Sequence, residues 1–295
     1  MTAYSLHPAT RLGEVRLKVS DLDRSLDFYQ DVIGLRVRSR QDGLAELTAD
    51  GSDVLLVLQE VPNAYIVPER SVSGLYHFAI LLPTRKALGL ALRRLLDKGI
   101  QVGQADHGVS EALYLSDPDL NGIEIYRDRP RSEWEYNEQG FVKMRSEPID
   151  WHGLLAEADG ETWAGMPEGT MIGHVHLHVA DLGQAKRFYC DALGFDIEAD
   201  LKRQMGALFV GAGRYHHHLG MNIWAGAGAP PAPAHGTGIV YFTVLLPSEE
   251  ELDKTVRNLE AYGCEVRRED SIRWVKDPSG SGIQVKLAVQ RDALR

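Results

Sequence analysis

The side chains best suited to chemistry in this sequence are histidines and carboxylates inside apolar, strand-like segments. Glu124 stands between isoleucines in the string IEIY. Strand side chains alternate between two faces, so Glu124 points away from the isoleucine face and toward a cavity. A buried carboxylate there needs a partner or a metal ion. His77, in the string YHFAILL, would by itself more often be a hydrogen-bonded core residue, and it gains a chemical interpretation only together with Glu124.

Further histidines occur in two short strings. The string GHVHLHV carries histidines at alternate strand positions, so they share one face and at most one or two can bind a single ion. They are His174, His176 and His178. The string YHHHLGMNIW carries His216–His218, and alternation allows only one of His217 and His218 to face a cavity. Because imidazole titrates near neutral pH, these strings are candidates for metal binding and acid–base catalysis.

The elements that position these side chains are repeated along the chain. Residues 13–37 read GEVRLKVSDLDRSLDFYQDVIGLRV, and they align without a gap, at an offset of 160, with GHVHLHVADLGQAKRFYCDALGFDI at 173–197. A second pair follows, YHFAILLPTRKALGLALRRLLDKGIQV from 76 and VYFTVLLPSEEELDKTVRNLEAYGCEV from 240. Each member of that pair precedes an Asp-Pro turn, in SDPDLNGIEI and KDPSGSGIQV. The chain is therefore a tandem duplication.

Each half also divides into two units of one pattern. Residues 13–19 alternate as a strand does, a helix is predicted from Asp21-Leu22 to Gly34, and short strands follow. Each quarter is predicted as βαβββ. Since one unit cannot bury both faces of its sheet, we expect an α+β fold in which units pair into curved mixed sheets around a metal cavity.

We expect two tandem domains, at 10–130 and 171–290, joined by a segment at 131–170. That segment is long for a connection, and it is interpreted either as a linker or as a cover packed over a cavity. The tryptophans that would pack such a cover are Trp134, Trp151 and Trp163.

Composition excludes several classes of protein. The 295 residues are 44% hydrophobic and 25% charged, which is typical of a globular chain. Lys plus Arg is 32 against 42 for Asp plus Glu, and the net charge of −10 disfavours nucleic acid or a membrane surface as a partner. No apolar run approaches the roughly 18–20 residues of a membrane span, and no signal peptide is recognised, so a cytoplasmic protein is expected. The two cysteines are too few for a disulfide framework.

The duplicated units, with the strings DLDRSLDFYQDVIGL and DPDLNGIEIY, resemble the vicinal oxygen chelate superfamily. That superfamily includes glyoxalases, fosfomycin-resistance enzymes and extradiol dioxygenases. The four-unit length and the strings HFAILLP, EALYLSDPDLNGIEIY and GHVHLHVADL resemble catechol 2,3-dioxygenase-like members most closely. The resemblance covers nearly the whole chain except 129–170. It implies a non-haem Fe(II) extradiol dioxygenase that opens the ring of catechol or a substituted catechol, with O₂, next to the diol.

The resemblance also implies the metal ligands. In the resembling ring-cleaving enzymes two histidines and one glutamate hold a ferrous ion and leave positions open. The matching positions are His77 and Glu124 in unit two and His174 in unit three. The corresponding positions of units one and four carry Glu14, Tyr241 and Gln284. Neither half has a complete set, so a pairing of units two with three is favoured, with pairing inside each half as the alternative. Ligand type does not separate Fe(II) from Mn(II).

Candidate catalytic residues follow from the same resemblance. Tyr114, ten residues before Glu124, stands where resembling dioxygenases place a tyrosine that hydrogen-bonds the substrate oxygen. His107 precedes the same strand and would contact substrate. The acid–base histidine is expected at His217 or His218, with the register left open.

Three other functions are compatible with this sequence. A glyoxalase-like metal-dependent isomerase would need Glu14 together with His77, Glu124 and His174. A metal-dependent thiol transferase is disfavoured, because such chains are typically a single two-unit half. A ligand-sequestering protein with a decayed metal site would be non-catalytic. The expected partners are a small aromatic diol and O₂, and the exposed unit edges are compatible with a homo-oligomer.

Overall fold

The computed structural model describes residues 4–288, and its elements repeat the predicted order four times. Unit one contains β1 (Arg11–Val19), α1 (Leu22–Asp27), the π-helical η1 (Phe28–Ile33), β2 (Arg36–Gln41), β3 (Leu44–Thr48) and β4 (Val54–Glu60). Unit two contains β5 (Gly74–Leu81), α2 (Arg85–Asp97), β6 (Gly103–Asp106), β7 (Ser110–Ser116) and β8 (Gly122–Asp128).

The second half has one short addition. Unit three contains β9 (Met171–His178), α4 (Leu182–Lys186), the π-helical η3 (Arg187–Ala192), β10 (Asp196–Leu201), α5 (Lys202–Met205), β11 (Ala207–Gly211) and β12 (Leu219–Asn222). Unit four contains β13 (Gly238–Leu246), α6 (Glu249–Ala261), β14 (Arg267–Glu269), β15 (Ile272–Lys276) and β16 (Gly282–Leu287). Between the halves lie η2 (Arg131–Glu133) and α3 (Trp151–Ala156). The extra element is α5, which the repeat pattern does not predict.

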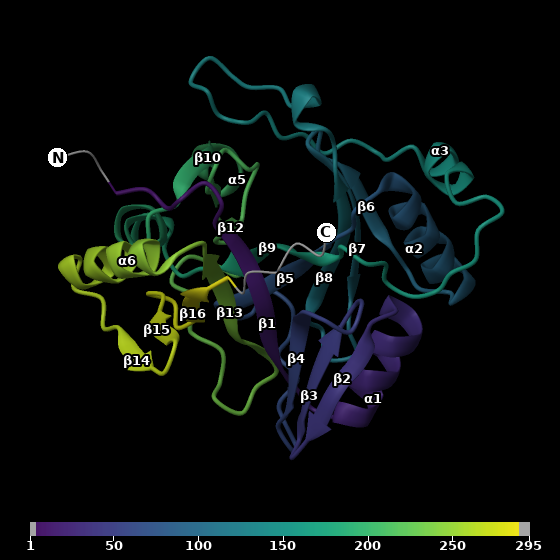
Figure 1. The fold of residues 1–295 in the computed structure, drawn as a ribbon, viewed down its shortest axis with the longest axis horizontal. Helices are drawn as coiled ribbons and strands as arrows, with labels where there is room; N and C mark the ends of the chain where they lie inside the picture. The colour runs from purple at the N-terminus through teal and green to yellow at the C-terminus, as the bar shows by residue number, and fades with distance from the viewer. Residues whose placement is uncertain (1–3, 289–295) are drawn as a thin grey trace.

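The units pair across the two halves, not within them (Figure 1). Strand β1 runs antiparallel to β13, and β5 runs antiparallel to β9. Units one and four therefore form a sheet of order β14-β15-β16-β13-β1-β4-β3-β2, which we call the 1–4 sheet. Units two and three form a sheet of order β10-β11-β12-β9-β5-β8-β7-β6, the 2–3 sheet. The predicted α+β fold and the favoured cross-half pairing are confirmed, and the alternative of pairing inside each half is wrong.

The first unit helix begins at Leu22, as the sequence predicts, and the other three begin in the same way. Each has a side-chain N-cap that accepts a hydrogen bond from a backbone amide of the first turn. The caps are Asp21, Thr84, Asp181 and Ser248. The first helix continues through η1 and ends at Gly34, whose φ of 89° needs a residue without a Cβ. The longest helices, α2 and α6, have 13 residues each, and no helix within residues 4–288 is long and apolar enough to cross a membrane.

The repeated Phe-Tyr and Asp-Pro strings are structural links between the sheets. The hydroxyl of Tyr29 in η1 donates to Asp117 Oδ2 at 2.9 Å, and Tyr189 in η3 donates to Asp277 Oδ2 at the same distance. All four side chains are buried. Each bond joins the helix of one sheet to a turn of the other sheet. These strings recur in both halves because they hold the two sheets together.

The three tryptophans of the connecting segment lie at different places. Trp134 is buried, and its ring lies 5.2 Å from that of His216, beside the histidine-rich strands of the 2–3 sheet. Trp151 begins α3, which packs against α2 on the outside of the molecule (Figure 1). Trp163 contacts Gly34 at the end of η1. The segment thus covers histidines with its first part and helices with its second part.

Candidate metal centre

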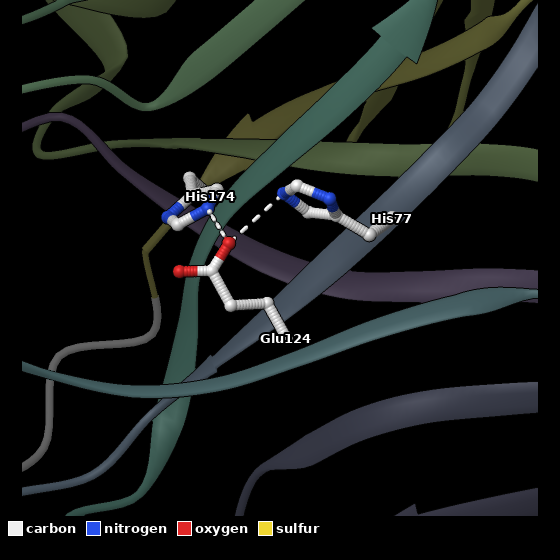
Figure 2. A group of neighbouring side chains, drawn as sticks. All are labelled: His77, Glu124 and His174. Carbon is white, nitrogen blue, oxygen red and sulfur yellow. Dashed lines mark hydrogen bonds and ion pairs between the residues drawn. The ribbon is translucent and has the colours of Figure 1, made fainter. Parts of the chain in front are cut away.

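Register places three side chains on one face of the 2–3 sheet. In the sheet, Ala79 of β5 is paired with Glu124 of β8 on one side and with His174 of β9 on the other. Ala79 is small, so the two larger side chains can approach each other above it. His77 lies two residues before Ala79 and therefore on the same face. Figure 2 shows the Glu124 carboxylate between the imidazoles of His77 and His174.

The distances suit ligands of a single ion. Glu124 Oε2 lies 3.0 Å from His77 Nε2 and 3.0 Å from His174 Nε2, and the ligand atoms all lie within 4.8 Å of one another. Such N and O ligands lie about 2.0–2.2 Å from a divalent transition metal, so neighbouring ligands at right angles are about 3 Å apart. His77 Nε2 is buried and has no aligned hydrogen-bond partner, which a metal ion would supply. The donor set fits the two-histidine, one-carboxylate triad.

The charge states of Glu124 and His77 also suit a metal. Burial by itself raises the pKa of the Glu124 carboxyl, but the charges and hydrogen bonds of His174 and His77 outweigh it and hold the pKa well below its usual value. Burial lowers the pKa of His77, against the opposing effect of Glu124. An ionised carboxylate and a neutral imidazole are the forms that bind metal ions.

Tyr114 and His107, predicted separately, form one hydrogen-bonded pair. Tyr114 of β7 lies directly opposite Glu124 of β8 in the ladder. His107 Nδ1 lies 2.7 Å from the carbonyl oxygen of Arg145, which only accepts, so Nδ1 carries the proton. In the neutral ring His107 Nε2 then accepts from the Tyr114 hydroxyl at 2.7 Å. Burial, and next the charge of Glu124, raise the pKa of Tyr114 well above its usual value, so Tyr114 stays a neutral phenol.

The structure separates the two candidates for the acid–base histidine. The ring of His217 lies 4.2 Å from that of His174, beside the candidate metal centre. Burial, followed by the charge of His174, lowers the pKa of His217 well below its usual value. His218 instead accepts a hydrogen bond at Nδ1 from the Ala212 amide and lies against Phe195. The placement therefore favours His217 for chemistry and gives His218 a structural environment.

The remaining histidines of β9 are hydrogen-bonded to a residue that the sequence did not single out. Asn222 of β12 donates through Nδ2 to His176 Nε2 at 2.9 Å and accepts at Oδ1 from His178 Nδ1 at 2.6 Å. Burial lowers the pKa of both histidines. An asparagine within the apolar string LGMNIW was the available signal. His176 and His178 thus line the site as neutral, oriented rings.

A pocket of about 260 Å³ opens onto this region. Its lining includes His77 and Tyr114, together with Glu69 and Arg70 of the loop before β5. Glu69 and Arg70 also line a wider cleft, whose other lining residues come from both sheets.

The equivalent positions of the 1–4 sheet form no second centre. Glu14 is paired with Lys286 at 2.7 Å, and Gln284 Oε1 accepts from the Thr243 hydroxyl at 3.2 Å. Burial, and next the charge of Glu14, raise the pKa of Tyr241 to about 12. In the part of the chain that the structure describes, the metal-ligating group consists of His77, Glu124 and His174. The isomerase hypothesis needed Glu14 in that group, and Glu14 is not part of it.

Comparison with known proteins shows the family and the fold. The model of the Glyoxalase/Bleomycin resistance protein/Dioxygenase superfamily matches residues 11–125 and 171–285. A catechol-2,3-dioxygenase of Bacillus subtilis (strain 168) is 53% identical over 280 residues, which cover 95% of this chain and 98% of that protein. A biphenyl-2,3-diol 1,2-dioxygenase of Rhodococcus globerulus is 33% identical over 121 residues, covering 40% of this chain and 63% of its own. In fold, the chain is similar to glyoxalase I from Zea mays, with a TM-score of 0.54, 16% identity and coverage of 95% of this chain and 92% of that one.

Proposed function

Given that this chain belongs to the glyoxalase/bleomycin resistance/dioxygenase superfamily and is homologous to a catechol-2,3-dioxygenase, we propose that it is an Fe(II) extradiol dioxygenase. It would open the ring of catechol or a substituted catechol with O₂, next to the diol. The observation that carries this proposal is the convergence of two buried imidazole nitrogens on one carboxylate oxygen, each at 3.0 Å. His77, Glu124 and His174 would hold the ion.

The bound ion would supply a Lewis acid with open positions for the two diol oxygens and for O₂. Three protein ligands leave such positions open, whereas a fully ligated structural site would not. The single negative charge of Glu124 leaves the site with a net positive charge when a divalent ion is bound, which favours an ionised diol.

The surrounding residues provide proton transfer and orientation. His217, a neutral imidazole beside His174, would accept a proton from a diol hydroxyl and return it to the opened product. Tyr114, kept protonated by burial, would accept a hydrogen bond from a diol hydroxyl, and His107, which accepts the Tyr114 proton, would hold the phenol in place. Trp134, buried beside the ring of His216, would help to exclude water from these histidines.

The pocket favours a small substrate. Pockets for drug-sized ligands are usually about 300–1,000 Å³, and the pocket at His77 measures about 260 Å³. A single-ring diol is therefore the substrate class that we propose. The aromatic side chains Tyr76 and Tyr114 line its walls and would contact the ring faces or edges.

The test is oxygen uptake by protein reconstituted anaerobically with Fe(II) and then given catechol and O₂. We expect stoichiometric iron, oxygen uptake and the yellow colour of a ring-opened semialdehyde. The Glu124→Ala variant should lose both iron and uptake, whereas Glu138→Ala, which removes an exposed carboxylate, should lose neither. Reconstitution with Mn(II) in parallel identifies the preferred ion.

Two results would overturn the proposal. Absence of both bound iron and bound manganese would mean that the triad is not a metal centre. Iron bound without oxygen uptake, over a panel of single-ring diols, would mean that the centre supports another reaction.

A further inference from the structure

A chain of hydrogen bonds leads from the candidate base to the edge of the protein. His217 Nδ1 lies 2.8 Å from Nδ1 of its neighbour His216. His216 is fully buried, and its Nε2 lies 2.9 Å from Asp128 Oδ1 at the end of β8. The Asp128 side chain is 26% exposed. Neither Asp128 nor His216 belongs to the metal centre or touches the pocket at His77.

The direction of these hydrogen bonds follows from the acceptor at the end of the chain. An ionised carboxylate only accepts, so the bond to Asp128 requires a proton on His216 Nε2. In a neutral ring the other nitrogen, His216 Nδ1, is then an acceptor. Its partner, His217 Nδ1, must donate and carry the proton of its own ring. The second nitrogen of His217, Nε2, is left with a free electron pair.

The surroundings keep this arrangement in one orientation. The Tyr215 hydroxyl donates to the same Asp128 Oδ1 at 3.2 Å. The hydroxyls of Tyr126 and Tyr215 lie 2.7 Å apart. Because Tyr215 has already donated its proton to Asp128, Tyr126 must be the donor in this second bond. The ring of Tyr215 lies 4.2 Å from that of His216, and the ring of Trp134 lies 5.2 Å from that of His216. His216 can therefore neither turn over nor exchange its partners without disturbing several buried contacts.

We propose that Asp128 and His216 are positioning residues that select the tautomer of His217, with the proton on Nδ1 and with Nε2 free to act as the base. The proposal rests on the role of His217 in the proposed function. A base with its proton on the wrong nitrogen cannot accept one from the diol. The proton transfer itself breaks the diol O–H bond, forms a bond from hydrogen to His217 Nε2, and leaves the electron pair on the diol oxygen.

The direct test reads the tautomer and not the activity. Protein labelled with ¹⁵N-histidine and loaded with Zn(II), which is diamagnetic, would be measured by long-range ¹H–¹⁵N correlation. We expect His217 to carry its proton on Nδ1 in the unmodified chain. Asp128→Asn keeps an oxygen acceptor and should preserve this tautomer, whereas Asp128→Ala should give a mixture of tautomers. Asp191→Asn, a partly buried aspartate paired with Lys186, is the matched control and should change nothing.

A kinetic readout separates positioning from simple loss of structure. In the Fe(II)-loaded protein Asp128→Ala should lower kcat about 10-fold, less than the roughly 10²–10⁴-fold value of a complete general base, with KM for catechol within about twofold. Asp128→Asn should recover most of kcat. A His217 ring protonated on Nε2 in the unmodified chain would overturn the proposal, and so would an unchanged tautomer in Asp128→Ala. Because the spectra use Zn(II), they remain informative even if the Fe(II) protein cleaves no diol.

Discussion

His218 gives a prediction whose magnitude follows from its burial. Burial lowers the pKa of His218 to about 3 from an ordinary value of 6.5, with smaller effects from the charges of neighbouring groups. In the folded chain this ring stays neutral down to about pH 3, whereas in the unfolded chain it gains a proton below about pH 6.5. The unfolded state therefore binds more protons in this window, and stability falls as the pH falls through it.

The size of the effect is set by the width of the window. Each pH unit between the two pKa values costs about 1.4 kcal/mol per group. Acidification from about pH 8 to about pH 5 crosses about 1.5 units of the window, so His218 alone should remove about 2 kcal/mol of unfolding free energy. The substitution His218→Asn removes the titrating ring, while the Asn Oδ1 can still accept from the Ala212 amide.

The assay is urea unfolding of metal-free protein, followed by tryptophan fluorescence, at about pH 8 and about pH 5. The unmodified chain should lose about 2 kcal/mol more than His218→Asn between the two pH values, whatever the absolute stability of the variant. His152→Asn, at an exposed position of α3, should behave as the unmodified chain. Parallel losses in the unmodified chain and in His218→Asn would refute the neutral, buried state of His218.

Three further predictions follow from the site and the fold. In the Fe(II)-loaded protein His217→Asn should lower kcat by about 10²–10⁴-fold, as expected for loss of a general base, whereas His218→Asn should keep most of kcat in steady-state assays. Tyr29→Phe and Tyr189→Phe should each lower the unfolding free energy by about 1.5–3 kcal/mol in urea titrations, because each leaves a buried aspartate without its phenol donor. Mn(II) at about 100 times its Kd should stabilise the unmodified chain by about 2.7 kcal/mol in thermal unfolding and should not stabilise Glu124→Ala.

Each of these predictions has a result that contradicts it. Equal kcat losses at the two histidines would mean that side-chain alternation does not decide which one reacts. A Tyr29→Phe variant no less stable than Tyr262→Phe, a change at an exposed tyrosine, would show that the sheet-to-sheet link contributes nothing. Full stabilisation of Glu124→Ala by Mn(II) would place the ion elsewhere.

Local patterns in the sequence are sufficient to predict the helices and strands of each unit. The offset of 160 between two long strings, the period of the apolar residues and the helix start at Asp21-Leu22 predict four βαβββ units, because strand alternation, helix periodicity and capping act over a few residues. The metal ligands came from a resemblance, and the incomplete sets in both halves favoured pairing of the middle units.

Only the tertiary structure decided which side chains meet. Glu124 and His174 are neighbours because β8 and β9 both pair with β5 at Ala79, and this register depends on contacts between strands that are far apart in the chain. Asn222 and Asp128 also depend on contacts between distant segments. Asn222 orients two histidines of another strand, and Asp128 can act on His217 only through its hydrogen bond to His216. Local sequence determines which face of a strand a residue occupies, but the partner strand and its register are set by the packing of the whole chain, and the chemistry depends on both.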